Sequence, residues 1–108
     1  MRELTGRELM QWQSVPAPLL LDVREPWEVA IAAIRIEGVE SLHIPMGEIT
    51  TRAAELDATR PVVCICHHGV RSAQVVDYLT RLGFTAGYNL AGGIDAWSIE
   101  VDPAVPRY

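Results

Sequence analysis

Two short apolar runs, residues 19–23 and 62–66, place the tightest limit on the fold of this chain. Each follows a proline, each is too short for a buried helix, and neither alternates between apolar and polar residues as a half-exposed strand does. The pattern is typical of strands buried on both faces, which occur in parallel sheets covered by helices. Residues 41–44 and 87–90 add two shorter runs of strand type. We therefore expect an α/β fold, a doubly wound sheet of mostly parallel strands with helices on both faces.

Segments with helical spacing separate the expected strands. Thr5 and Glu8 have the spacing of a capping box, and Pro26 suits the first turn of a helix. The first expected helix follows Thr5 and has Leu9 and Trp12 on its inner face, and the second begins at Pro26. A third carries Ile49, Ala53 and Leu56, and a fifth carries Ile94 and Trp97. The fourth runs from Ser72 to a stop at Gly83, with its apolar residues on one face: Val75, Val76, Leu79 and Leu82. The sequence has neither a repeat nor a linker, so we expect one domain, residues 1–108, with an irregular tail packed on its surface.

Charge, hydropathy and cysteine spacing limit the partners and the cellular compartment that we expect. The net charge is −5, which gives no reason to expect nucleic acid or an anionic membrane surface as a partner. The sequence contains no apolar run of transmembrane length and no apolar segment after its first residues, so we expect a cytoplasmic location and no membrane contact. Cys64 and Cys66 are separated by one residue, and in a reducing compartment neither is expected in a structural disulfide.

The junction between the strand at 62–66 and the helix from Ser72 is the leading candidate for a functional site. Ligands of open α/β sheets bind beside the carboxyl ends of the strands, which is where Cys66 stands. Gly69 permits a tight turn, and loop amides with a helix N-terminus behind them form an anion site. Arg71 adds a permanent positive charge. Such surroundings favour the thiolate of Cys66, so the pattern predicts a nucleophilic thiol beside a bound anion.

Four segments, in this order, resemble the motifs of a rhodanese domain nearly end to end: residues 20–25 (LLDVRE), 43–45 (HIP), 66–72 (CHHGVRS) and 90–97 (LAGGIDAW). The resemblance implies a sheet of about five strands and a Cys66 that cycles between thiolate and persulfide. It also implies that the amides of residues 67–71 bind the persulfide. The spacing from Cys66 to Arg71 is that of the sulfurtransferases, because related phosphatases and arsenate reductases have a loop longer by one residue. Residues 34–42 are somewhat longer than the corresponding family segment, which leaves the local register open.

From these inferences we expect a thiosulfate sulfurtransferase with ping-pong kinetics and no cofactor. Its partners would be a small anionic sulfur donor and a thiol or cyanide acceptor, and a sulfur-carrier protein is a further candidate acceptor. The expected substrate-binding residues are His67, His68, Gly69, Val70, Arg71 and Ser72.

Several of these residues also have plainer interpretations. Cys64 is expected to be a buried strand residue, with a resolving thiol as the alternative. A zinc site of Cys64, Cys66, His67 and His68 is disfavoured, because four ligands within five residues can hardly surround a tetrahedral ion. Arg71 could instead close the loop by pairing with a carboxylate, and a histidine could act as a general acid. Structural roles are expected for Asp22 and Arg24, packing for Trp27 and Trp97, and a solvated face for Glu37 and Glu40.

Three competing functions remain open from the sequence. The first is a sulfur relay module, because residues 101–108 are similar to the ends of rhodanese domains fused to adenylating enzymes. The second is a phosphatase or arsenate reductase on the same scaffold, which the short loop disfavours. The third is a non-catalytic binding or redox-sensing module, against which the presence of Cys66 argues.

Overall fold

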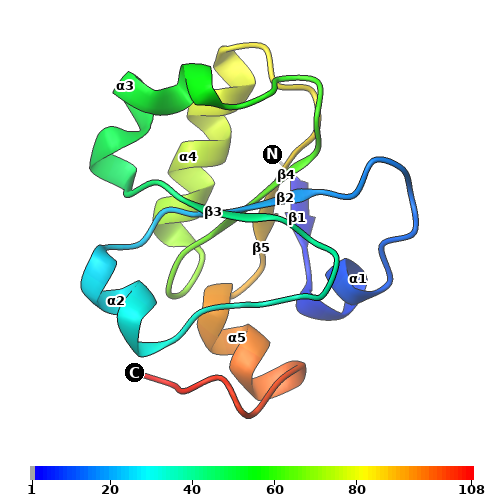
Figure 1. Cartoon of the computed structure of the whole chain (residues 1–108), viewed down its shortest axis with the longest axis vertical. Helices are drawn as coiled ribbons and strands as arrows, with labels where there is room; N and C mark the ends of the chain where they lie inside the picture. Colours follow the sequence, from blue (N-terminus) through cyan, green and yellow to red (C-terminus); the bar gives the residue numbers. More distant parts are fainter. Residues whose placement is uncertain (1) are drawn as a thin grey trace.

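The computed structural model describes residues 2–108 and has the expected α/β architecture (Figure 1). Five strands pair in parallel in the order β1-β5-β4-β2-β3, so the prediction of a doubly wound, mostly parallel sheet is confirmed. The strands are β1 (Arg2–Leu4), β2 (Leu19–Asp22), β3 (Ser41–His43), β4 (Val62–Ile65) and β5 (Gly87–Leu90). Since β4 is the central strand, its carboxyl end lies at the middle of one edge of the sheet.

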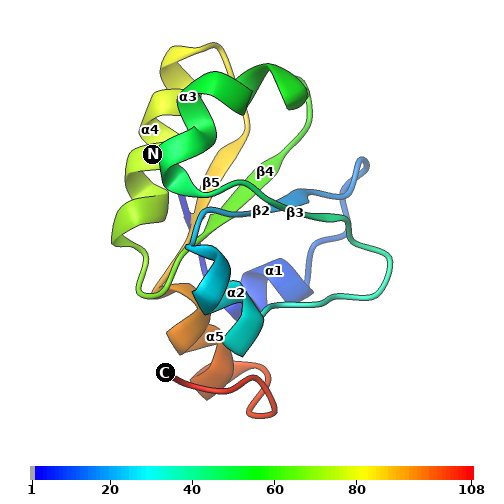
Figure 2. The same cartoon turned by 60° about the vertical axis from the view of Figure 1, so that its left-hand side comes forward.

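Helices cover both faces of this sheet. They are α1 (Gly6–Met10), α2 (Pro26–Ile31), α3 (Ile49–Arg52), α4 (Val70–Arg81) and α5 (Gly93–Glu100), with 3-10 turns at Met46–Glu48 and Ala53–Glu55. Figures 1 and 2 show α3 and α4 on one side of the sheet and α1, α2 and α5 on the other. The two-sided cover explains why β2 and β4 are apolar along almost their whole length.

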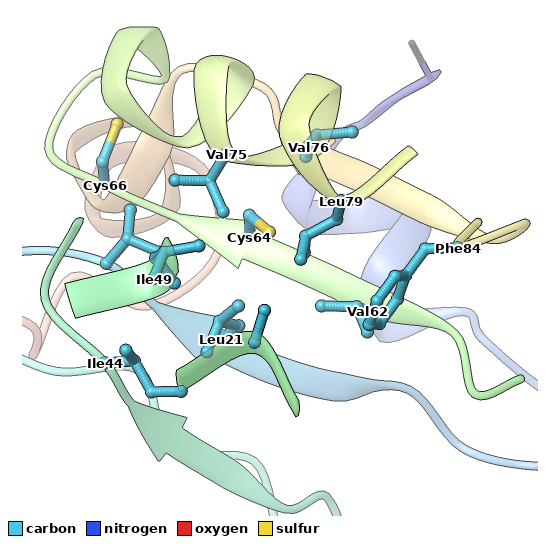
Figure 3. Packing of buried hydrophobic residues seen from close by; sticks show 12 residues of the cluster. Leu21, Ile44, Ile49, Val62, Cys64, Cys66, Val75, Val76, Leu79 and Phe84 are labelled. Carbon is cyan, nitrogen blue, oxygen red and sulfur yellow. The ribbon is translucent and has the colours of Figure 1, made fainter. Parts of the chain in front are cut away.

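Side chains of β4 alternate between two apolar clusters, as the period of a strand requires. Val62 and Cys64 belong to the cluster under α4, together with Val75, Val76 and Leu79 from that helix (Figure 3). Val63 and Ile65 belong to the opposite cluster, together with Ile94 and Trp97 from α5. The core is thus divided by the sheet, and β4 is anchored from both faces just before Cys66.

The sequence interpretation missed β1, which pairs with β5 at the edge of the sheet. This strand has three residues, and Arg2 and Glu3 are exposed, so it lacks the apolar run that identifies the inner strands. Leu4 lies opposite Leu90 in the register and packs against the cluster on the α5 side. Pairing with a preformed strand, rather than its own burial, therefore makes this segment a strand.

Helix boundaries differ from expectation at α4. The helix begins at Val70, two residues before Ser72, and it ends at Arg81. Leu82 was expected on the inner face but is 50% exposed, because it follows the last helical residue and the chain then turns at Gly83 with φ of 104°. Gly83 as the stop of the helix is confirmed.

Two other segments depart in detail. The helix expected through Ile49, Ala53 and Leu56 is divided into the short α3 and its flanking 3-10 turns, and Leu56 lies beyond them. Trp12 follows the end of α1 and packs its edge against the ring of Tyr88 instead of facing the core from a helix. Among residues 2–108, no helix has the length and apolar character needed to cross a membrane.

Candidate active site

The Cys66 loop, residues 66–69, joins the carboxyl end of β4 to the first turn of α4. Cys66 is 1% exposed, and its sulfur lies beside that turn (Figure 3). The Gly69 N–H donates to Cys66 Sγ at 3.0 Å, and Ser72 Oγ lies 3.2 Å from the same sulfur. Three of the predicted site residues therefore meet at one atom. The amide and the positive end of a twelve-residue helix face the sulfur, which is an arrangement that stabilises negative charge there.

Gly69 makes this loop possible. It caps α4 with a φ of 100°, a left-handed conformation that other residues adopt at a cost. A Cβ at this position would also lie 3.4 Å from the amide nitrogen of Gly92. The glycine predicted from the sequence as the permissive residue of the turn is therefore the one whose amide faces the sulfur.

The first turn of α5 holds the other side of the Cys66 loop. The amides of Ile94 and Asp95 donate to the carbonyl oxygens of Cys66 and His67, at 2.9 and 3.1 Å. This approach requires Gly93, because a Cβ there would collide with both carbonyl groups, and its φ is 64°. The carbonyl groups of Cys66 and His67 therefore have hydrogen-bond partners in α5.

Arg71 forms a two-pronged ion pair with Glu28 of α2. Its Nη1 and Nη2 lie 2.6 and 2.8 Å from the two carboxylate oxygens. Hydrogen bonds from Arg71 are the largest of the effects that lower the pKa of Glu28 from 4.5 to about 2. The carboxylate pairing left open by the sequence is thus present, while anion binding by Arg71 stays a prediction. Its side chain as a whole remains 34% exposed.

Tyr108 ties the tail to the same network. Its hydroxyl donates to Glu28 at 2.8 Å and accepts from Arg24 at 2.9 Å. Its ring stacks on His67 at 4.0 Å between centroids, and His67 stacks in turn on His68. Burial, followed by the charge of His68, lowers the pKa of His67, which favours a neutral ring at pH 7. The tail is irregular as expected, but it contributes directly to the surroundings of the loop.

Asp22 and Arg24 have the structural geometry expected of them. Arg24 is fully buried, and its guanidinium donates to Asp22, with the closest contact at 2.7 Å, and to the carbonyl oxygen of Ala32. These groups join the end of β2 to the segment after α2. Trp27 packs at the rim, edge-on to Tyr108, and Trp97 lies in the core.

The hydrogen bonds that the described residues make to the sulfur come from Gly69 and Ser72, not from Val70 or His68. Val70 is 69% exposed at the start of α4, and the His68 side chain is 63% exposed. One ligand atom each from His67, His68 and Asp95 lies within 4.8 Å of the others, but Asp95 already binds Arg107 at 2.9 Å. This group contains neither cysteine, so it is not the zinc site considered from the sequence.

Cys64 lies two residues before Cys66 and is fully buried. Burial raises the pKa of its thiol to about 12, with a smaller contribution from Cys66. The thiol is therefore neutral at physiological pH and has no path to solvent in the folded chain. This geometry favours the plain reading of Cys64 as a core residue over a resolving thiol.

Comparison with known proteins identifies the scaffold. The family description "Rhodanese-like domain" matches residues 5–100. The chain belongs to the rhodanese-like family. A sulfurtransferase of Allochromatium vinosum is 40% identical over 87 residues, covering 81% of this chain and 78% of that protein. A rhodanese-related protein of Thermoplasma volcanium has a structure with a TM-score of 0.83 at 31% identity, covering 100% of both chains.

A longer relative shows the same domain in a larger setting. The chloroplastic rhodanese-like/PpiC domain-containing protein 12 of Arabidopsis thaliana is 38% identical over 92 residues, which cover 82% of this chain. This chain spans 30% of the length of that relative. At the level of the rhodanese-like family, the supported activity is sulfur transfer.

Three residues of the rhodanese-like site escaped the sequence interpretation: Glu28, Asn89 and Tyr108. Glu28 was not singled out from the sequence, although it is 3% exposed and binds Arg71. Asn89 is the polar residue at a buried position of β5, a signal that could have marked it. Tyr108 carried no comparable signal, because its role depends on how the tail folds back.

Proposed function

We propose that this chain transfers sulfane sulfur from a small donor to a thiophilic acceptor through a persulfide on Cys66. The observation that carries the proposal is the hydrogen bond from the Gly69 amide to Cys66 Sγ, at 3.0 Å, in front of the N-terminus of α4. An amide aimed at this sulfur stabilises the thiolate that attacks the donor and the thiolate that returns when the acceptor removes the outer sulfur. The family supports the reaction class, and this contact supports Cys66 as the residue that carries the sulfur.

The proposed reaction has two steps. The Cys66 thiolate attacks the outer sulfur of the donor, a new S–S bond forms, and the donor's own S–S bond breaks. With thiosulfate as donor, sulfite leaves with the electron pair. An acceptor then attacks the outer sulfur of the persulfide, and the bonding electrons return to Cys66 as a thiolate. Cyanide as acceptor yields thiocyanate, and a thiolate as acceptor yields a new persulfide.

Thiosulfate is the donor we propose, and Arg71 is the residue proposed to bind its sulfonate oxygens. The pair with Glu28 uses two of the five N–H groups of the guanidinium, so others remain for an oxyanion. Glu28 also offsets the charge of Arg71. We therefore expect modest affinity for a dianion and a lower KM for thiosulfate in Glu28→Gln.

Intact-mass measurement after incubation with thiosulfate tests the proposal, with Cys66→Ala and Cys64→Ala beside the native chain. The expected result is a gain of one sulfur that cyanide reverses and that only Cys66→Ala loses. Initial-rate kinetics should give parallel double-reciprocal lines, as a ping-pong reaction requires. Absence of any gain from thiosulfate, glutathione persulfide or mercaptopyruvate would refute the proposal.

Loading without rapid release to cyanide points to the relay function instead. In that case the persulfide should accumulate and pass only to a protein acceptor. Hydrolysis of an aryl phosphate in place of sulfur loading would indicate the phosphatase alternative.

A further inference from the structure

Asn89 is a buried side chain of β5 that reaches the site through Ser72. It is 2% exposed and lies opposite Cys64 in the strand register. Its Nδ2 donates to the carbonyl oxygen of Gly69 at 3.0 Å and to Glu3 Oε1 at 3.2 Å, and its Oδ1 accepts a hydrogen bond from Ser72 Oγ. Every polar atom of this amide therefore has a partner.

These partners determine the orientation of the amide. A carbonyl oxygen and a carboxylate only accept hydrogen bonds, so the NH₂ group must face Gly69 and Glu3. The Oδ1 atom is left facing Ser72, and an amide oxygen is also only an acceptor. The hydrogen between these two groups must then come from the Ser72 hydroxyl.

Ser72 has one hydroxyl hydrogen and two neighbours that compete for it. When that hydrogen points to Asn89, Ser72 Oγ can accept from the Cys66 thiol, 3.2 Å away. The hydrogen bonds then run in one direction, from Cys66 through Ser72 to Asn89. When Cys66 is a thiolate, Ser72 can donate to it only by leaving two oxygens facing each other without a hydrogen, which is unfavourable.

We propose that Asn89 is a positioning residue that holds the Ser72 hydroxyl hydrogen away from Cys66 and so favours the thiol and the persulfide over the bare thiolate. In the persulfide, the inner sulfur carries neither a proton nor the main charge, so Ser72 keeps its bond to Asn89. The consequence for sulfur transfer rests on the proposed function. The hydrogen-bond arrangement itself does not.

Other charged and titratable groups lie on the neighbouring elements, and of these Arg71 and Cys64 interact electrostatically with Cys66. They are Arg71 on α4, Glu28 on α2, His67 and His68 in the loop, Asp95 on α5, Glu3 on β1, Asp22 on β2 and the neutral thiol of Cys64 on β4. Substitutions at residues 72 and 89 leave all of these groups in the chain. A change in Cys66 titration that depends on both residues therefore reports the hydroxyl hydrogen.

The test measures the rate of Cys66 alkylation by iodoacetamide across pH, by intact mass and without any sulfur donor. Asn89→Val removes the acceptor and keeps a side chain suited to a strand. It should lower the pH at half-maximal rate by about one unit, the size of one hydrogen bond to a charged group. In a Ser72→Ala background the same substitution should leave the midpoint unchanged.

Ser72→Ala alone provides a second, independent arm. Because the Ser72 hydrogen rests on Asn89 and its oxygen accepts from the thiol, removal of the hydroxyl from the otherwise native chain should leave the midpoint unchanged or lower it. A rise of about one unit would place that hydrogen on the thiolate and overturn the proposal. Asn89→Ala serves in place of Asn89→Val if the latter does not fold.

Two further results would also overturn it. One is an unchanged or raised midpoint in Asn89→Val. The other is a fall of equal size with and without the Ser72 hydroxyl, because the effect would then act through the carbonyl group of Gly69. None of these outcomes depends on sulfur loading, so the inference and the proposed function can fail separately.

Discussion

Cys64 in β4 and Cys66 just after this strand are the same residue type in the same apolar cluster, yet the surroundings of their sulfurs differ. Cys64 lies among apolar side chains, and burial raises the pKa of its thiol to about 12. Cys66 is almost as buried, at 1% exposure, but an amide and a hydroxyl face its sulfur. Burial alone therefore does not separate an inert thiol from a reactive one. The difference comes from two residues of additional chain, which carry the second sulfur past the strand to the end of a helix.

The largest effect should come from exchanging the two cysteines for alanine. Cys66→Ala should lose all transfer of sulfur from thiosulfate to cyanide, because no other thiol reaches the site. Cys64→Ala should retain it, since its sulfur contacts only the core. Thiocyanate production measures both. Loss of activity in Cys64→Ala with a folded chain would reverse the ranking of the two residues.

Gly69→Ala should weaken the site without removing the nucleophile. The left-handed backbone at Gly69 strains any other residue by about 1–3 kcal/mol, so the loop should shift and persulfide loading should slow about tenfold or more. Gly83 is the matched control, because its φ of 104° imposes the same strain with nothing within 4 Å of a Cβ. Gly83→Ala should lose similar stability but keep the loading rate, as followed by timed intact-mass spectra. Equal loading rates in the two variants would contradict the role of the loop.

Serine substitutions should affect stability in the opposite order, with the larger loss at Cys64 and the smaller at Cys66. Cys64→Ser places a hydroxyl among apolar side chains and should lower the free energy of unfolding by about 1–3 kcal/mol. Cys66→Ser should cost less, because its hydroxyl can accept the hydrogen bond from Gly69. Urea denaturation measures both values. A larger loss of stability in Cys66→Ser than in Cys64→Ser would mean that the serine hydroxyl at position 66 does not accept the hydrogen bond from Gly69.

Glu28, like Cys66, is a buried group whose neighbours decide its charge, and hydrogen bonds from Arg71 and Tyr108 favour its ionised carboxylate. Its pKa falls from 4.5 to about 2, so its contribution to stability is complete above pH 4.5 and is lost as the pH falls towards 2. Glu28→Gln should remove this part of the acid sensitivity, which is the smallest of the four effects. Denaturation midpoints between pH 5 and 2 provide the measurement, and parallel curves for the two chains would contradict it.

The sequence revealed the parts of the site that are local in the chain. Cys66, Gly69 and the start of α4 lie within a few residues, so a strand, a turn and a helix pattern were enough to bring them together. Glu28 contacts Arg71, 43 positions away in the sequence, and Tyr108, 80 positions away. No periodicity encodes such contacts. β1 escaped for a related reason, since its pairing with β5 rather than an apolar run defines it.

The hydrogen bonds from α5 to the Cys66 loop have a consequence for the motion of the site. The amide hydrogens of Ile94 and Asp95 are occupied by the carbonyl groups of Cys66 and His67. Each can exchange for solvent deuterium only when that contact opens, and exchange of this kind is observed over minutes to hours. These two amides therefore report how often the loop leaves its place, although neither residue contacts the sulfur. Slower exchange after sulfur loading would show that the persulfide makes the loop more rigid.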